Sequence, residues 1–287
     1  MILYLEKFRL PSREAEYSFF AGQPLTCYNT YYPFEVFTER EVPELIFEPI
    51  TFFYGGNGSG KTTMLNVIAE KIGAVRDTPF NHSTFFGDYV DSCKETWAYG
   101  YSHQDSMVIT SDDVFDYIFN IRAMNEGIDV KRVRMLDEYS KLRYSNFKMR
   151  SLADYEELKR VNSARFNTKS EFVRKEAGGN IRELSNGESA LMYFSEKIQN
   201  NRIYLLDEPE NSLSAEYQKE LLKFITDSAR FFNCQFIIAT HSPFLLSAEG
   251  ALIYDLDSDP VEAKKWTELG NVRSYYNFFK EHENEFH

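Results

Sequence analysis

Residues 55–62 combine the residue types that bind phosphate. The segment GGNGSGKT places Gly55 and Gly60 with four residues between them, and Lys61 and Thr62 follow at once. Glycines let the backbone curl so that its N–H groups face phosphate oxygens, while the lysine neutralises phosphate charge and the hydroxyl binds Mg²⁺. We therefore predict a site for ATP and Mg²⁺. The predicted contacts are Gly55, Asn57, Gly58, Ser59, Gly60, Lys61, Thr62 and Thr63.

Two acids end an apolar segment in the last third of the chain. The segment IYLLDE runs from Ile203 to Glu208 and reads as a buried strand with carboxylates at its carboxyl end. Open α/β sheets bind ligands at that end of their strands. Asp207 is predicted to hold Mg²⁺ through water, and Glu208 to act as general base on the attacking water. Taken alone, the pattern also fits a strand end that happens to be acidic.

His241 directly follows a second apolar strand, FIIAT, in the segment ATHSPF. A single histidine is usually an ordinary surface or core residue. At the tip of the strand that follows the acidic one, however, its imidazole can reach the terminal phosphate of a nucleotide. Lys61, Glu208 and His241 are therefore the predicted catalytic residues.

The stretch LSNGES, Leu184–Ser189, resembles a second phosphate-binding segment. Taken by itself it fits a plain helix N-cap formed by Ser185 or Asn186. It lies about 120 residues after a phosphate-binding loop that already looks complete. Two such devices in one chain need an explanation.

The elements around these motifs alternate in type. ITFFYG reads as a strand before the glycine loop, and KTTMLNVIAEKIG as the helix after it. QFIIAT and ALIYDLD read as further strands, and SAEYQKELLKFITDSARFF as an amphipathic helix. Such alternation predicts an α/β fold with a mostly parallel core sheet.

Three lobes are predicted within one domain of 287 residues. Residues 1–113 hold an N-terminal part of antiparallel strands and the glycine loop, with an irregular region from about residue 76 to 104. Residues 114–180 form a charged helical insert, in which Val130, Val133 and Leu136 recur at three-residue steps. Residues 181–287 hold LSNGES, the acidic strand and His241.

These motifs together resemble the ABC-type ATPases of the RecF/SMC-like class, especially the small stand-alone bacterial ATPases of the AAA_21 type. The matches are FFYGGNGSGKTT, LSNGES, LLDEPENSLS, IIATHSPFLL and ALIYDLDSD, spread over residues 45–257. The resemblance implies a P-loop NTPase fold of ABC type. It also implies that Ser185 and Gly187 grip the terminal phosphate of a nucleotide held by another subunit. A head-to-tail homodimer with two ATP molecules between the protomers would explain both devices.

Some residues depart from the family pattern. Asn186 and Glu188 stand where transporters commonly have Gly and Gln, and residues 212–214 replace the usual Ala-Leu-Asp. The usual glutamine after the strand SMVIT is not obvious. The segment points to Asp112 as a metal contact, with Gln104 as the alternative.

Arg9, in the segment KFRL, resembles a nucleotide contact of SMC-type heads. An exposed charge on a strand is an equally good reading of this residue.

The composition of the chain limits the classes of protein to which it can belong. No long uncharged apolar run predicts a membrane span, the first residues do not read as a signal peptide, and three cysteines without metal or disulfide spacing fit the cytoplasm. A net charge of −12 disfavours a nucleic-acid partner, although the helical insert carries a basic run. We expect an ATP-driven switch for a separately encoded protein effector, in DNA repair or phage defence. The alternative is the nucleotide-binding subunit of a membrane transporter.

Overall fold

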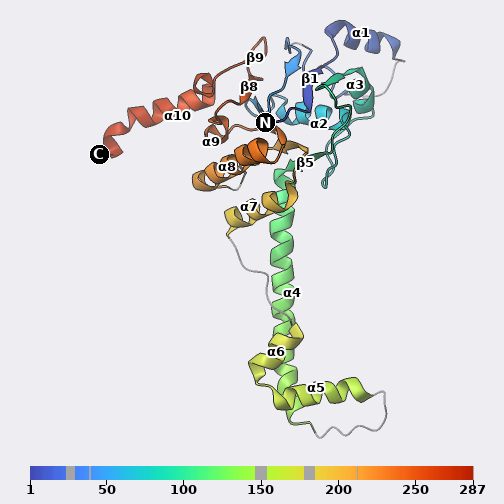
Figure 1. Cartoon of the computed structure of the whole chain (residues 1–287), viewed down its shortest axis with the longest axis vertical. Helices are drawn as coiled ribbons and strands as arrows, with labels where there is room; N and C mark the ends of the chain where they lie inside the picture. Colours follow the sequence, from blue (N-terminus) through green and yellow to red (C-terminus); the bar gives the residue numbers. More distant parts are fainter. Residues whose placement is uncertain (24–29, 39, 146–153, 178–184, 212, 287) are drawn as a thin grey trace. The chain divides into compact units, whose positions relative to one another are not determined.

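The computed structural model describes residues 1–23, 30–38, 40–145, 154–177, 185–211 and 213–286 (Figure 1). Contacts between residues divide the chain into two units. One unit holds residues 1–114 and 186–287, and the other holds residues 115–185. None of the described helices has the length and apolar content needed to cross a membrane.

A six-stranded sheet forms the centre of the first unit, in the order β5-β6-β7-β3-β8-β9. Five strands are parallel, and only β9 runs antiparallel to its neighbour β8. Every residue of β3 and β7 is buried, which explains why these strands are almost continuous apolar runs. The predicted α/β fold with a mostly parallel core sheet is confirmed. The strands are β3 Ile50–Tyr54, β5 Ser106–Thr110, β6 Ile203–Asp207, β7 Gln235–Ala239, β8 Leu252–Asp255 and β9 Glu262–Ala263.

Helices pack on this sheet and place the motifs. Helix α2 (Lys61–Lys71) contacts β5, β6 and β7. Because it follows β3 through the glycine loop, its N-terminus stands at the carboxyl end of the parallel strands. Helix α8 (Ala215–Phe231) contacts β7, α7 (Asn186–Lys197) and the short helix α9 (Pro243–Leu246). The phosphate-binding loop, the acidic strand end and the segment after β7 therefore meet at one edge of the sheet.

A smaller antiparallel sheet, with the order β2-β1-β4, confirms the predicted N-terminal β part. Its strands are β1 Leu5–Arg9, β2 Leu45–Ile46 and β4 Lys94–Trp97. The side chain of Gln235 in β7 joins the two sheets. Its Oε1 accepts hydrogen bonds from the backbone N–H groups of Tyr4 and Leu5, both at 2.9 Å, and its Nε2 donates to the Leu5 carbonyl at 2.8 Å. A fully buried glutamine is tolerated because both ends of its amide are paired.

Two helices occur where the sequence pattern did not predict them. Helix α1 (Arg13–Gly22) lies in the region expected to form strands, and α3 (Phe86–Ser92) in the region expected to be irregular. Ser12 caps α1 by accepting from the Ala15 N–H at 3.3 Å, and two glutamates stand in its first turn. This capping signal outweighs the β preference of the surrounding aromatic residues.

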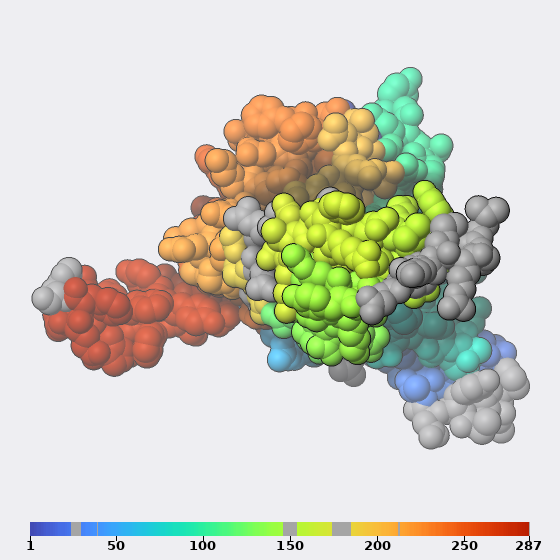
Figure 2. All heavy atoms as spheres, turned by 90° about the horizontal axis from the view of Figure 1, so that it is seen from below, coloured from blue at the N-terminus to red at the C-terminus, as the bar shows by residue number. Residues whose placement is uncertain are grey.

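The C-terminal part of the first unit consists of the 3₁₀ turn η2 (Trp266–Glu268), helix α10 (Gly270–Glu281) and the turn η3 (Glu283–Phe286). Figure 1 shows α10, in red, extending away from the sheet of its unit, and the same red segment protrudes at one side of Figure 2. Its aromatic side chains Tyr275, Tyr276, Phe278 and Phe279 are exposed.

The second unit is helical, as predicted for the insert. It contains most of α4 (Ser111–Arg143), together with α5 (Tyr155–Phe166) and α6 (Lys169–Ala177). Its small core contains Tyr139, Ala164, Phe172 and Val173, with Met135 and Leu142 packed against it. The three-residue series Val130, Val133 and Leu136 is exposed instead, so the packing face of α4 is offset from the one that the sequence suggested.

Candidate nucleotide site

The glycine loop between β3 and α2 has the backbone that a phosphate cradle requires. Gly58 and Gly60 adopt φ angles of 82° and 93°, a region that side-chain-bearing residues rarely enter. A Cβ on Gly60 would lie 2.8 Å from the Phe37 ring. The loop lines a hollow of about 450 Å³ together with Val36, the first turn of α2 and Glu208.

Lys61 begins α2 and is buried beneath the loop. Its ammonium donates to the carbonyls of Gly55 at 2.7 Å and Gly56 at 3.1 Å. The same Nζ lies 3.8 Å from Glu208 Oε1. A positive charge is thus fixed at the floor of the hollow, where it can neutralise phosphate charge.

Thr62 and Asp207 form the candidate metal position. The Thr62 hydroxyl donates to Asp207 Oδ1 at 3.1 Å. Burial raises the pKa of the Asp207 carboxyl to about 6, and the nearby carboxylates of Glu208 and Glu210 add to this rise, against the hydrogen bond from Thr62 and the charge of Lys61. A bound cation would stabilise the ionised form of this carboxylate, and Mg²⁺ is commonly held by one carboxylate and substrate phosphates. The residues present therefore fit Mg²⁺.

Glu208 lies between Lys61 and His241. Its Oε1 is 3.6 Å from His241 Nδ1, and Asn211 Nδ2 donates to its Oε2 at 3.1 Å. Glu208 has a φ of 46°, a left-handed conformation that costs a non-glycine residue about 1–3 kcal/mol. Backbone strain of this kind is concentrated at functional sites. Lys61, Glu208 and His241 are brought together, as a catalytic set would have to be.

The segment LSNGES leads into α7. Ser185 is exposed just before the helix, whereas Leu184 lies outside the described residues. Gly187 is buried against α8, because a Cβ there would lie 2.3 Å from Tyr217 Cδ2. Among the described residues of this segment, none lines the hollow beside the glycine loop.

The segment after the acidic strand is described in part. Ser212 lies outside the described residues, Leu213 is buried, and Ser214 caps α8.

Two other predicted contacts, Arg9 and Asp112, are not among the described residues that line the hollow. Arg9 is exposed at the end of β1, opposite Lys94. Asp112 is exposed in the first turn of α4, while its neighbour Asp113 is buried and accepts from the Thr110 N–H at 2.7 Å. The nucleotide and metal roles of Arg9 and Asp112 stay predictions.

Gln104, the alternative to Asp112, precedes β5 and donates to the Asn201 carbonyl, before β6. It therefore lies at the edge of the sheet opposite the acidic residues, which removes it as a nucleotide contact.

Two further residues, for which the sequence pattern predicted no role, brace the glycine loop. Asp257 Oδ2 accepts from the Gly56 N–H at 2.7 Å. Arg40 donates to the carbonyl of Ser59 and, at 3.0 Å, to that of Leu256. Since β3 and β8 are parallel neighbours, the acidic segment that ends β8 had to lie beside the loop that ends β3.

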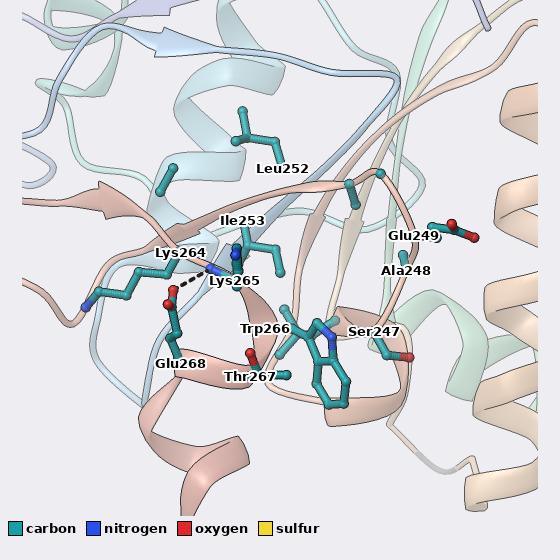
Figure 3. Close-up of a pocket in the computed structure, with 14 residues that line it drawn as sticks. Ser247, Ala248, Glu249, Leu252, Ile253, Lys264, Lys265, Trp266, Thr267 and Glu268 are labelled. Carbon is teal, nitrogen blue, oxygen red and sulfur yellow. Dashed lines mark hydrogen bonds between the residues drawn. The ribbon is translucent and has the colours of Figure 1, made fainter.

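A larger hollow, of about 730 Å³, lies elsewhere in the first unit (Figure 3). Residues 246–253 and 263–268 line it, among them Trp266, and Glu268 accepts from the Lys265 N–H at 3.1 Å. Its lining includes none of the described residues of the glycine loop or of the acidic strand. Size alone therefore does not mark the nucleotide site.

Known families match the sequence at these motifs. The ABC transporter family model covers residues 47–211, more than half of the chain, and an AAA ATPase domain model covers residues 181–246. The chain belongs to the ABC transporter family. It is an ABC-type ATP-binding domain, and the predicted resemblance to ABC-type ATPases is confirmed.

Individual relatives are distant. The probable ABC transporter ATP-binding protein p29 of Mesomycoplasma hyorhinis is 24% identical over 205 residues, which cover 69% of this chain and 72% of that protein. An Smc head domain from Pyrococcus furiosus, with an extended coiled coil and bound to the C-terminal domain of ScpA, is 14% identical with a TM-score of 0.43 and coverages of 96% and 100%. The SMC head domain from Thermotoga maritima is 12% identical with a TM-score of 0.38 and coverages of 91% and 98%.

Proposed function

We propose that this ABC-type domain hydrolyses ATP and uses Lys61, Glu208 and His241 as its catalytic residues. One observation carries the proposal. Both Lys61 Nζ and His241 Nδ1 lie within 4 Å of Glu208 Oε1, at 3.8 and 3.6 Å. A carboxylate between two cationic or neutral donors, beside a glycine loop, is the arrangement that attack of water on a terminal phosphate requires.

The chain's own residues have separate tasks in this reaction. Glu208, held by Asn211, accepts the proton of the attacking water, while Lys61 and the loop amides neutralise phosphate charge. His241, beside Glu208, would contact the terminal phosphate. Thr62 and Asp207 would hold Mg²⁺, which would polarise the phosphates and neutralise the charge that develops on them.

The segment LSNGES, as a second phosphate-binding segment, supports a head-to-tail homodimer. Gly187 packs on α8, and the described residues of LSNGES do not line the chain's own phosphate hollow. The N-terminus of α7, with Ser185 just before it, offers the dipole and donors that suit an anion. A second copy would bring this end of α7 to the nucleotide held by Lys61, so that two ATP molecules lie between the protomers.

The output of such a switch is a protein partner rather than nucleic acid. The net charge of −12 opposes binding to a phosphate backbone. The basic run on α4 is also interleaved with acids, since Arg132 pairs with Asp129 at 3.1 Å and Arg160 of α5 pairs with Glu138 at 2.6 Å. Acids among the basic side chains reduce the field that a phosphate backbone would meet.

Replacing Glu208 tests the proposal. Glu208→Gln removes the base but keeps the size of the side chain, so turnover is expected to fall by about 10²- to 10⁴-fold while ATP still binds. The variant should then accumulate as an ATP-bound dimer, measured by light scattering with saturating Mg-ATP. A variant that stays monomeric under these conditions contradicts the dimer, and one that hydrolyses ATP at the normal rate contradicts the base.

A nucleotide-binding subunit of a membrane transporter is the second candidate. The observation that favours it is the match to the probable transporter ATP-binding protein of Mesomycoplasma hyorhinis. Affinity purification of the tagged chain from detergent-solubilised cells separates the two proposals. A stoichiometric membrane permease among the captured proteins supports the transporter, and a non-membrane protein captured only with the Glu208→Gln variant and ATP supports the switch.

A further inference from the structure

Glu210 is a buried residue for which the sequence pattern predicted no role. It lies two residues after Glu208 and is 5% exposed. Its Oε1 accepts three hydrogen bonds, from the Thr240 hydroxyl at 2.6 Å, the His241 N–H at 3.0 Å and the Ser242 N–H at 3.2 Å. All three donors come from the segment that follows β7.

These bonds pair backbone N–H groups that follow the end of β7. Strand β7 ends at Ala239, so the N–H groups of His241 and Ser242 leave the sheet without strand partners. Unpaired buried N–H groups cost about 1–3 kcal/mol each, and hydrogen bonds to a charged acceptor are the strong ones. The Glu210 carboxylate pairs both N–H groups, and the Ser242 N–H also donates to the Thr240 hydroxyl at 3.0 Å.

The same segment is held from its other side by α8. The Ser242 hydroxyl donates to Gln218 Oε1 at 2.6 Å, and Gln218 Nε2 donates to the Leu213 carbonyl at 2.8 Å. Ser242 also caps α9 by accepting from the N–H groups of Phe244 and Leu245. The segment carrying His241 thus has little freedom, and Glu210 supplies the bonds nearest to the imidazole.

We propose that Glu210 is a positioning residue for His241. Glu208 and Glu210 leave the same turn after β6, one facing the imidazole and the other binding the backbone of the same histidine. Oε1 of Glu210 also lies 3.7 Å from His241 Nδ1. The role rests on the proposed ATPase function, because it acts by holding His241 Nδ1 at 3.6 Å from Glu208.

The carboxylate uses only one of its oxygens for this purpose. Glu210 Oε2 is buried and has no hydrogen-bond partner among the described residues. An amide oxygen placed at Oε1 can accept the same three bonds, whereas an apolar side chain of similar size accepts none. Glu210→Gln and Glu210→Leu therefore form a matched pair of variants.

Two measurements test the proposal. In Glu210→Leu, the kcat of ATP hydrolysis should fall by about 100-fold with a nearly unchanged KM, since a small misplacement of a catalytic group can cost that much. Hydrogen exchange of a peptide covering Thr240–Leu245 should become faster in nucleotide-free protein. Glu210→Gln should stay within about threefold of the wild type in kcat, because it keeps the acceptor for bonds that each contribute only about 1 kcal/mol.

A double variant separates positioning from plain stability. If Glu210 acts through His241, Glu210→Leu should cost less than about twofold in kcat once His241 is already alanine, since residues that act as a unit are not additive. Thr226→Val is the control, because the Thr226 hydroxyl bonds the Leu222 carbonyl within α8, away from His241. It should change neither kcat nor the exchange of the Thr240–Leu245 peptide.

Several results would overturn the positioning role. They are unchanged exchange of the peptide in Glu210→Leu, or a loss of kcat that is as large in the His241→Ala background as in the wild type. If Glu210→Leu does not fold, Thr240→Val removes one of the three donors, and unchanged exchange there has the same meaning. A wild-type protein that does not hydrolyse ATP would contradict the proposed function, while the exchange data would still decide the role of Glu210.

Discussion

The Thr62 hydroxyl and the Asp207 carboxylate meet across 3.1 Å, which joins the first turn of α2 to the end of β6. No single helix or strand contains this contact, because it links residues 145 positions apart in the chain. It depends on the parallel sheet that brings β6 beside the helix. Burial of the same carboxylate raises its pKa to about 6.

We predict that Asp207→Asn stabilises the nucleotide-free protein above pH 7 and weakens Mg²⁺-dependent ATP binding. A carboxyl whose pKa is raised on folding favours the protonated form, so its contribution to stability is complete below the unfolded value of 3.8 and is lost as the pH rises to the folded value of about 6. The free energy of unfolding that is lost in this way is at most about 3 kcal/mol. Thermal unfolding in chelator from pH 4 to 8 should show a Tm difference that is nearly constant above about pH 6 and shrinks toward pH 4. A difference that does not change with pH would contradict the raised pKa.

Gly60→Ala is expected to destabilise the protein and to weaken ATP binding more than Gly58→Ala. Both positions have positive φ angles, which cost an alanine about 1–2 kcal/mol. Only at Gly60 would the new methyl group also meet the Phe37 ring at 2.8 Å, whereas Gly58 has open space. Thermal unfolding and ATP titration of the two variants separate the backbone strain from the clash, and equal effects would show that Phe37 moves freely.

Ser185→Arg should leave ATP binding nearly intact while abolishing dimerisation and turnover, because the proposed role of Ser185 is on the nucleotide of the other protomer. Mixing this variant with Lys61→Ala should restore at most one composite site per dimer, which pairs Lys61 of one chain with Ser185 of the other. ATPase assays of the single and mixed proteins measure this. Loss of ATP binding by the Ser185 variant alone would favour a structural helix cap.

Duplex and single-stranded DNA should bind weakly or not at all to the ATP-bound Glu208→Gln dimer at physiological salt. The reason is the net charge of −12 and the acids among the basic residues of α4. Titration at several salt concentrations is the measurement, with Lys131, Arg132 and Arg134 replaced by alanine as the control. Micromolar binding with a steep salt dependence that flattens in the triple variant would make nucleic acid the partner.

The sequence predicted the core strands and the loop because each carries a local signal. Runs of buried apolar residues mark β3, β6 and β7, and glycines with positive φ mark the loop. Helix α1 was missed because its aromatic residues suggested strands more strongly than Ser12 suggested a cap.

Glu210, Asp257 and Arg40 could not be found in this way. Their bonds to Thr240, Gly56 and Leu256 span 30, 201 and 216 residues. Such contacts depend on the strand order, in which β3 lies between β7 and β8. No pattern within a window of the sequence contains that order.

The close approach of Gly187 to Tyr217 has an evolutionary consequence. Because a Cβ at position 187 would lie only 2.3 Å from the ring of Tyr217, a larger residue at 187 needs a change at 217. Descendants of this chain that gain a larger residue at 187 should first have exchanged the ring at 217 for something smaller. The residue at 217 in the first turn of α8 would thereby limit which residues the N-terminal turn of α7 can carry.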